Sequence, residues 1–413
     1  MGIAIPEEII VGNYPGSRQS LRIAFVTETY APEVNGAAMS IARVVEGLHR
    51  RHHDLQLIRP RQGDGDGAEC SPRLDQVLTR GVPIPRYPNL RAGLPARQLL
   101  VRMWSAQRPD VVHVATEGPL CWSALQAARR LGLPVSSDFR TNFHAYSRHY
   151  GIGWLHRPIR AYLRHFHNRT QCTMVPTESL RRELSSCGFR NLSVVSRGVD
   201  TRAFSPAHRS EALRAGWGAG PDDLVVACVG RVAAEKNLET LIAAFEAIRR
   251  IDARARVVIV GDGPLRAELQ ARHPAVCFAG QRSGGDLAAH YASADLFLFP
   301  SLTETFGNVT AEAMASGLPV LAFDYAAASQ LIRSTEGGVL VPFADTQAFV
   351  RHAIELAGNR MGLRAMGHRA REAAAKLDWE GVVARFEAVL AGLVGNGSAP
   401  AATTRASAVH SGG

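Results

Sequence analysis

Two glutamates, Glu304 and Glu312, lie eight positions apart around a turn that contains Gly307. The apolar strand expected at 295–300 comes directly before this turn, and Glu312 falls at the start of an expected helix. The start of a helix carries unpaired backbone N–H groups and partial positive charge, so it suits a phosphate. Carboxylates accept hydrogen bonds from paired hydroxyls. The segment therefore predicts a site for a ligand with both phosphate and polyol groups, such as a nucleotide sugar.

A second cluster of charged residues follows the strand expected at 223–230. Arg231 could bind a diphosphate through its planar fork and Lys236 as a point charge. The chain contains only two lysines, Lys236 and Lys376, and the second lies in an ordinary amphipathic helix. Taken alone, the segment is better explained by a surface charge at a helix start. The glutamate segment favours the alternative that both basic residues bind a ligand.

Weaker signals lie in the first half of the chain. Gly36 follows the first expected strand, where its backbone could approach a phosphate from the opposite side. Arg140 and His144 belong to a polar cluster at 138–146, at a strand end, where α/β sheets place their ligands. Either side chain could touch the reacting groups, although a single loop histidine usually has no special role. His113 lies inside an apolar run and is predicted to be a core residue.

The common motifs for dinucleotides and metals are incomplete or absent. The segment 261–265 resembles a dinucleotide fingerprint, but Arg266 stands where the third glycine is expected, so a tight strand-to-helix turn is favoured. The histidines form no HExxH motif and the six cysteines no CxxC, so we expect neither a metal nor another cofactor. Reduced core cysteines are typical of a cytoplasmic protein.

Strand–loop–helix alternation runs along most of the chain and predicts an α/β fold with doubly wound parallel sheets. It restarts near residue 223, which favours two Rossmann-like domains. The expected divisions are an N-terminal extension (1–20), a first domain (21–198), a second domain (199–376), a C-terminal helix (377–395) and a disordered tail (396–413). Residues 61–69 are rich in Gly and Asp and predict an exposed, flexible loop.

The net charge of +10 is concentrated in the first half. Residues 21–200 contain 25 arginines and 14 acidic residues, whereas residues 201–413 contain 21 of each sign. Such an asymmetry indicates an anionic partner, either a membrane surface or a nucleic acid, unless it merely reflects an arginine-rich composition. The segment 154–167 predicts a basic amphipathic helix. Its apolar stripe, formed by Ile159, Tyr162, Leu163 and Phe166, could lie on an anionic bilayer or, more commonly, face the core.

Taken together, Gly36, Arg231, Lys236, Glu304 and Glu312 make residues 21–395 resemble the retaining GT-B glycosyltransferases of family 4. The resemblance implies two Rossmann-like domains facing a central cleft, and a final helix that crosses back to the first domain. It also implies donor binding mainly by the second domain. The segments 27–36 and 306–310 resemble a bacterial branch that includes lipid mannosyltransferases and diacylglycerol glycosyltransferases.

The resemblance also implies roles for individual residues. Arg231 and Lys236 would hold the donor diphosphate, Glu312 the ribose hydroxyls and Glu304 the transferred sugar. Backbone N–H groups of the segment Phe306, Gly307, Asn308 and Val309 would meet the sugar or the phosphate. Relatives often carry His-Thr where this chain has Arg140 and Thr141. Three alternatives follow: Arg140 takes the role of that histidine, His144 takes it, or the local chemistry differs.

The implied function is retaining, metal-independent transfer of a hexose from GDP-mannose or a UDP-hexose to a membrane lipid. The expected partners are the nucleotide sugar, a lipid acceptor and an anionic membrane, rather than nucleic acid. The expected location is the cytoplasmic face of the membrane. Two alternatives stay open: a soluble saccharide or metabolite as acceptor, and a non-catalytic nucleotide-sugar binding protein.

Overall fold

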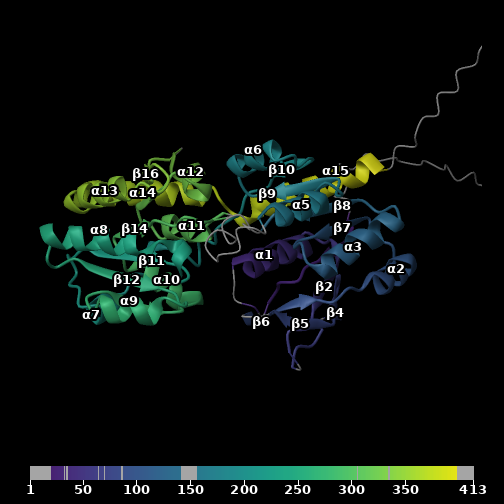
Figure 1. Ribbon diagram of the computed structural model, residues 1–413, viewed down its shortest axis with the longest axis horizontal. Helices are drawn as coiled ribbons and strands as arrows, with labels where there is room; N and C mark the ends of the chain where they lie inside the picture. The colour runs from purple at the N-terminus through teal and green to yellow at the C-terminus, as the bar shows by residue number, and fades with distance from the viewer. Residues whose placement is uncertain are drawn as a thin grey trace, which may run out of the picture.

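The computed structural model describes residues 20–397, apart from residues 32, 34, 35, 64, 69, 85, 86, 141–155, 305 and 334. Two α/β units lie side by side along the long axis (Figure 1). Each has a parallel sheet with helices on both faces, as strand–helix alternation predicts. His144 and the tail from residue 398 fall outside the described residues. The predicted domain boundaries stay predictions.

The first sheet has the strand order β10-β9-β8-β7-β1-β2-β4-β3 within the described chain. Its strands are β1 (Arg22–Val26), β2 (Asp54–Pro60), β3 (Cys70–Ser71), β4 (Leu74–Thr79), β7 (Val111–Val114), β8 (Val135–Asp138), β9 (Cys172–Val175) and β10 (Leu192–Val194). Neighbours pair in parallel except β3 with β4. The helices of this unit are α1 (Gly36–Arg50), α2 (Arg97–Ala106), α3 (Pro119–Arg130), α5 (His156–His167) and α6 (Glu178–Ser186). A separate hairpin joins β5 (Gly81–Ile84) to β6 (Tyr87–Gly93).

The second sheet is parallel throughout, in the order β13-β12-β11-β14-β15-β16. Its strands are β11 (Val225–Val229), β12 (Arg256–Val260), β13 (Cys277–Gly280), β14 (Leu296–Phe299), β15 (Val320–Phe323) and β16 (Gly338–Val341). They alternate with α7 (Glu211–Gly216), α8 (Leu238–Ile251), α9 (Arg266–Arg272), α10 (Gly284–Ala292), α11 (Asn308–Ala315), α12 (Ala326–Arg333), α13 (Thr346–Gly358) and α14 (Arg360–Ala375). Strands β11 and β14 are buried along their whole length, which explains their continuous apolar sequences.

Both sheets contain a point at which the strand order reverses. In the first sheet it lies between β1 and β7, and in the second between β11 and β14. Ligands of open α/β sheets bind outside the carboxyl ends of the strands at such points. The loops that leave β11 and β14 contain Arg231, Lys236 and Glu304. The topology therefore brings the two sequence-predicted charged clusters to one edge of the second sheet.

The last helix, α15 (Trp379–Gly397), leaves the second unit and packs on α1 of the first (Figure 1). Val383, Phe386 and Leu390 of α15 are buried in the same hydrophobic cluster as residues of α1 and β1. A Cβ atom at Gly47 of α1 would come within 2.4 Å of Val383, so only glycine allows this close approach. The helix thereby ties the C-terminal segment to the first unit.

The segment 61–69 is held more firmly than its composition predicts. Both terminal nitrogens of Arg59 donate to the carboxylate of Asp66, at 2.6 and 2.8 Å. Both side chains are largely buried, at 5% and 10% exposed. The expectation of an exposed, flexible loop is therefore wrong at Asp66, because a bidentate ion pair fastens it to β2.

Helix α5 turns its apolar stripe toward the protein. Leu163 and Phe166 are buried, and the exposed Tyr162 donates from its hydroxyl to the backbone oxygen of Glu117 at 2.6 Å. Arg157 and Arg164 lie exposed on the other side. Leu163 and Phe166 thus follow the core-facing alternative, whereas Tyr162 stays exposed at the edge of the stripe.

Candidate active site

The loop after β11 packs closely against the turn at 261–265. A Cβ atom at Gly261 would lie 1.9 Å from the backbone oxygen of Gly230, and one at Gly263 would lie 2.4 Å from that of Val232. Val232 also donates its N–H to Asp262 at 2.9 Å. These glycines therefore serve close backbone packing in a tight turn before α9, as expected. They fix the path of the loop that carries Arg231.

Lys236 and Glu304 form an ion pair that joins the two switch-point loops. Ser301 donates to the same Glu304 oxygen at 2.9 Å and lies 3.5 Å from the Lys236 ammonium. Both charged side chains are largely buried, at 17% and 15% exposed. Lys236 lies in a short 3₁₀ turn (η3, Ala234–Lys236) before α8, rather than in the helix itself. The pair fixes a cation and a carboxylate side by side at the strand ends.

Arg231 is held by Glu235, to which its Nε donates at 3.1 Å. The buried Glu235 is in turn fixed to the loop after β14, because its backbone oxygen accepts from the N–H of Leu302 at 3.0 Å. Arg231 keeps 32% of its side chain exposed. The sequence analysis did not identify Glu235, although its spacing of four residues from Arg231 would allow an ion pair in a single turn.

Helix α11 begins directly beyond Glu304. Gly307 has a left-handed φ of +94°, and a Cβ there would lie 3.5 Å from Glu304. The Phe306 side chain is buried in the core, so only its backbone could meet a ligand. The Asn308 amide lies 3.5 Å from the backbone oxygen of Gly36 at the start of α1. Two predicted donor-binding residues from opposite units are thus adjacent.

Glu312 lies in the second turn of α11, because the helix begins at Asn308 and not beside Glu312 as the sequence analysis expected. The hydroxyl of the fully buried Tyr291 donates to its carboxylate at 2.8 Å. Burial raises the pKa of Glu312 to about 7, and the hydrogen bond from Tyr291 opposes the shift. Tyr291 belongs to α10, and no local sequence pattern links it to Glu312.

On the first sheet, Asp138 and Arg140 follow β8 and form an ion pair. Arg197 follows β10, and its guanidinium carbon lies 5.9 Å from the centroid of the Phe306 ring. Burial, reinforced by the positive charge of Arg140, lowers the pKa of Arg197 to about 9, against the attraction of Asp138 and Glu304. The carboxyl edges of the two sheets therefore meet here. Sequence reasoning missed Arg197, although it precedes Gly198 at the expected domain boundary.

His113 is a core residue, as expected. Its ring is fully buried between Phe25 and Phe386, and its Nδ1 pairs with the Ser136 hydroxyl at 2.9 Å. Burial lowers its pKa to about 4. The residue is therefore neutral over the physiological range.

Glu28 occupies the switch point of the first sheet. Its carboxylate accepts a hydrogen bond from the N–H of Leu120 at 2.7 Å and lies at the start of α3. A Cβ atom at Gly118 would fall within 1.9 Å of this carboxylate. Burial raises the pKa of Glu28 to about 7. Its hydrogen bond indicates a helix-capping role.

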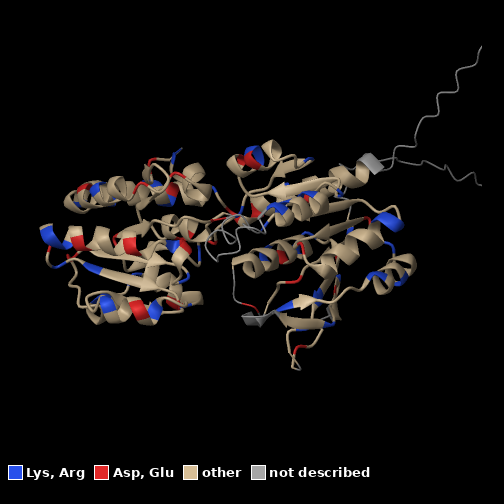
Figure 2. Ribbon diagram, in the orientation of Figure 1, with Lys and Arg blue, Asp and Glu red and all other residues tan. Residues whose placement is uncertain are grey.

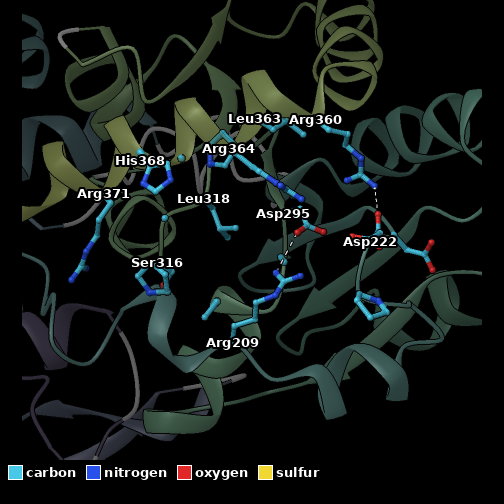
Figure 3. A pocket seen from close by; sticks show the side chains of 18 residues that line it. Arg209, Asp222, Asp295, Ser316, Leu318, Arg360, Leu363, Arg364, His368 and Arg371 are labelled. Atoms are coloured by element: carbon cyan, nitrogen blue, oxygen red, sulfur yellow. Dashed lines mark hydrogen bonds and ion pairs between the residues drawn. The ribbon is translucent and has the colours of Figure 1, made fainter.

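The described residues also line a cavity away from this edge. It has a volume of about 610 Å³ and lies between α14 and the amino ends of β14 and β15, among Arg209, Arg360, Arg364, His368 and Arg371 (Figure 3). Arg209 is paired with Asp295, and Arg360 and Arg371 donate to backbone oxygens. Since parallel sheets bind ligands at the opposite, carboxyl ends, we place the reaction at the switch-point loops and not in this cavity.

Within the described residues, no group of three His, Cys, Asp or Glu side chains is arranged to hold a metal ion. In the same part of the chain, no helix combines the length and apolar character needed to cross a bilayer.

The arrangement provides two cations, a helix N-terminus and two carboxylates along one sheet edge. The cations and the helix start suit a diphosphate, and the carboxylates suit the hydroxyls of a sugar and a ribose. Arg140 and Arg197 approach from the first sheet. The geometry brings Lys236 beside Glu304, Gly307 beside Glu304 and Asn308 beside Gly36. The roles of the predicted site residues stay predictions.

Comparison with known proteins gives two family matches. Residues 34–203 match the model described as glycosyltransferase family 4, and residues 223–359 match the model described as glycosyl transferases group 1. The chain is 37% identical to a GDP-mannose-dependent alpha-mannosyltransferase of Mycobacterium tuberculosis, over 79% of this chain and 85% of that one. It is 26% identical to an alpha-monoglucosyldiacylglycerol synthase of Streptococcus pneumoniae, over 78% of this chain and 75% of that one.

Solved structures share the architecture. The sucrose-phosphate synthase of Thermosynechococcus elongatus superposes with a TM-score of 0.73 at 19% identity, covering 91% of this chain and 99% of that one. At this identity the similarity establishes the fold alone.

Proposed function

This chain belongs to glycosyltransferase family 4 and is a glycosyltransferase of the GT-B fold, and from that premise we propose a specific reaction. It moves a hexose, with retention of configuration, from a nucleotide sugar to a membrane lipid. GDP-mannose and a UDP-hexose are the candidate donors. The main support for donor binding is the Lys236–Glu304 ion pair, which joins the loops after β11 and β14 beside Arg231.

In this proposal the second unit binds the donor. Arg231 and Lys236 bind the diphosphate, and Glu312 accepts hydrogen bonds from the ribose hydroxyls. Glu304 accepts hydrogen bonds from the transferred sugar, and the backbone N–H groups of α11's first turn, at Asn308 and Val309, face the phosphate or the sugar. Because Lys236 and Glu304 are already in contact, the residue that binds the diphosphate leaving group lies beside the residue that binds the transferred sugar.

The chemical step creates negative charge on the departing nucleoside diphosphate. The bond from the anomeric carbon to the diphosphate oxygen breaks, and a bond to the acceptor oxygen forms on the same face. The acceptor proton passes to a diphosphate oxygen. Cations fixed before the reaction stabilise this charge without reorganisation, an effect worth about 10²- to 10³-fold per group removed. Arg140, or His144 in its place, would contact the reacting groups from the first unit.

The lipid acceptor is supported by two observations. Relatives of this chain include an enzyme named for synthesis of a glucosyl diacylglycerol. Arginine exceeds acidic residues only in the first half of the chain, although Figure 2 shows residues of both signs on both units. A basic surface of this kind binds anionic lipid headgroups. We therefore propose peripheral attachment to the cytoplasmic face of a membrane.

A donor panel with a total lipid extract as acceptor, read by mass spectrometry, tests the proposal. The expected product is a lipid one hexose heavier, formed with one of the nucleotide sugars. The enzyme itself is expected to bind anionic vesicles at low salt. Efficient transfer to a soluble sugar without vesicle binding would instead support the soluble-acceptor alternative. Donor binding without turnover in any arm would support the non-catalytic alternative.

A further inference from the structure

Two arginines at the edge of the first sheet, Arg140 and Arg197, have no role in binding the donor diphosphate in the proposed function. They come from segments that follow β8 and β10, whereas Arg231 and Lys236 come from the second sheet. Arg197 contacts the ring of Phe306, two positions beyond Glu304. Arg197 therefore lies beside the loop that would hold the transferred sugar, and the positive charge of Arg140 acts on it.

Arg140 is buried and incompletely paired. Its side chain is only 6% exposed, and its single ion pair in the described residues is with Asp138. In the same described part of the chain, its Nε and one terminal nitrogen have no hydrogen-bond partner. Buried donors are almost always satisfied by protein, water or ligand. The orphaned N–H groups of Arg140 thus indicate that something else occupies this site when the enzyme works.

Arg197 is held in place by its backbone. A Cβ atom at the next residue, Gly198, would meet Trp379 of α15 at 2.9 Å, so α15 packs directly on this segment. The N–H of Val199 donates to the backbone oxygen of Leu377 at 2.8 Å. The charges that act on the Arg197 guanidinium are those of Arg140, Asp138 and Glu304. The packing of α15 therefore fixes the segment that carries Arg197, within range of the charge of Arg140.

We propose that Arg140 and Arg197 form a binding site for an anionic group, a phosphate or a carboxylate, on the acceptor. The forked guanidinium binds such groups through two parallel hydrogen bonds. An anion here would satisfy the buried N–H groups of Arg140 and neutralise the repulsion between the two arginines. The donor diphosphate has its own cations on the second sheet, so the first-sheet pair is assigned to the acceptor. This inference rests on the proposed function and narrows its acceptor class.

The test compares matched acceptors in mixed micelles at saturating donor. One pair is phosphatidylglycerol against diacylglycerol, and the other is a hexuronosyl against a hexosyl diacylglycerol. The first measures preference for phosphate, the second for carboxylate. We expect wild type to prefer at least one anionic member. Arg197→Gln and Arg140→Gln should lower the ratio of kcat/KM for anionic over neutral acceptor by about 10- to 100-fold.

Three controls keep the result interpretable. Arg197→Lys retains the charge and should recover part of the preference, which a merely structural role would not show. Arg190→Gln removes an exposed arginine of the same unit and should leave the ratio unchanged. The Kd of the nucleotide-sugar donor, measured by calorimetry, should stay within about twofold in all variants.

Other outcomes contradict the inference in distinguishable ways. Equal loss on charged and neutral acceptors would show that the arginines do not recognise an anion on the acceptor. A weakened donor Kd would assign them to the donor instead. Absence of donor binding and transfer in wild type would refute the proposed function itself.

Discussion

The ionisation of Glu312 should control how tightly the donor binds. Its carboxylate is assigned to the ribose hydroxyls, and it accepts from them only when ionised. Its pKa is about 7 in the ligand-free protein because burial disfavours the charge. The diphosphate diester of a nucleotide sugar does not titrate near this pH. Donor affinity should therefore fall as the pH drops through 7.

The magnitude follows from the fraction of protein that is competent to bind. About 91% of Glu312 is ionised at pH 8 and about 9% at pH 6, so the apparent Kd should rise about tenfold between these values. Glu312→Gln cannot ionise. It should bind the donor about tenfold more weakly at pH 8, since hydrogen bonds to a charged group are stronger, and its affinity should not vary with pH.

Tyr291→Phe provides the matched perturbation. The hydroxyl of Tyr291 lowers the pKa of Glu312, so removing it should move the midpoint of the profile to higher pH. Calorimetric titration of each variant with donor between pH 6 and pH 8.5 measures these effects. A flat wild-type profile, or a glutamine variant that keeps the wild-type slope, would refute the assignment of Glu312.

Three further predictions concern other parts of the molecule. Lys236→Ala should lower kcat by about 10²- to 10³-fold in the transfer assay, whereas Lys376→Ala, which removes the other lysine, should not change it. Gly263→Ala would place a Cβ 2.4 Å from the Val232 oxygen, so urea unfolding should show a loss of about 1–3 kcal/mol together with weaker donor binding, while Gly285→Ala, with open space around it, should not destabilise. Burial lowers the pKa of His113 from 6.5 to about 4, so as the pH falls the imidazole is protonated in the unfolded chain before it is protonated in the folded protein. About 3 kcal/mol of stability should be lost between pH 6.5 and pH 4, and a His113→Gln variant should lose correspondingly less over that window.

The sequence was most informative where a short segment determines its own structure. The apolar runs of β11 and β14 predict buried strands because both faces of a parallel sheet are covered. The charged loops after them could be placed at one sheet edge from strand alternation alone. By contrast, β4 was missed, since its sequence LDQVLT lacks a continuous apolar run and the strand lies near the sheet edge.

The contacts that tune the site could not be predicted, because they join distant segments. Tyr291 and Glu312 are 21 positions apart and meet only when α10 and α11 pack together. Arg197 lies in a connecting segment, and nothing in its neighbours indicates that Phe306 lies beside it. Asp66 looked like part of a solvated loop because its partner Arg59 lies in the preceding strand. Burial and pairing of charges are tertiary properties, which local patterns do not encode.

The pairing of charges also explains how the site keeps its shape before a ligand arrives. Arg231, Lys236 and Arg140 each have a carboxylate partner, so these cations are fixed and their mutual repulsion is offset. Among the residues that the structure describes, no ion pair is recorded for Arg197, which lies on the segment between the two units. An arriving anion would therefore gain most from Arg197, since the other three cations are already partly neutralised. Replacing Arg197 should therefore weaken anion recognition while the Arg140–Asp138 pair stays intact, whereas replacing Arg140 would also leave the Asp138 carboxylate unpaired.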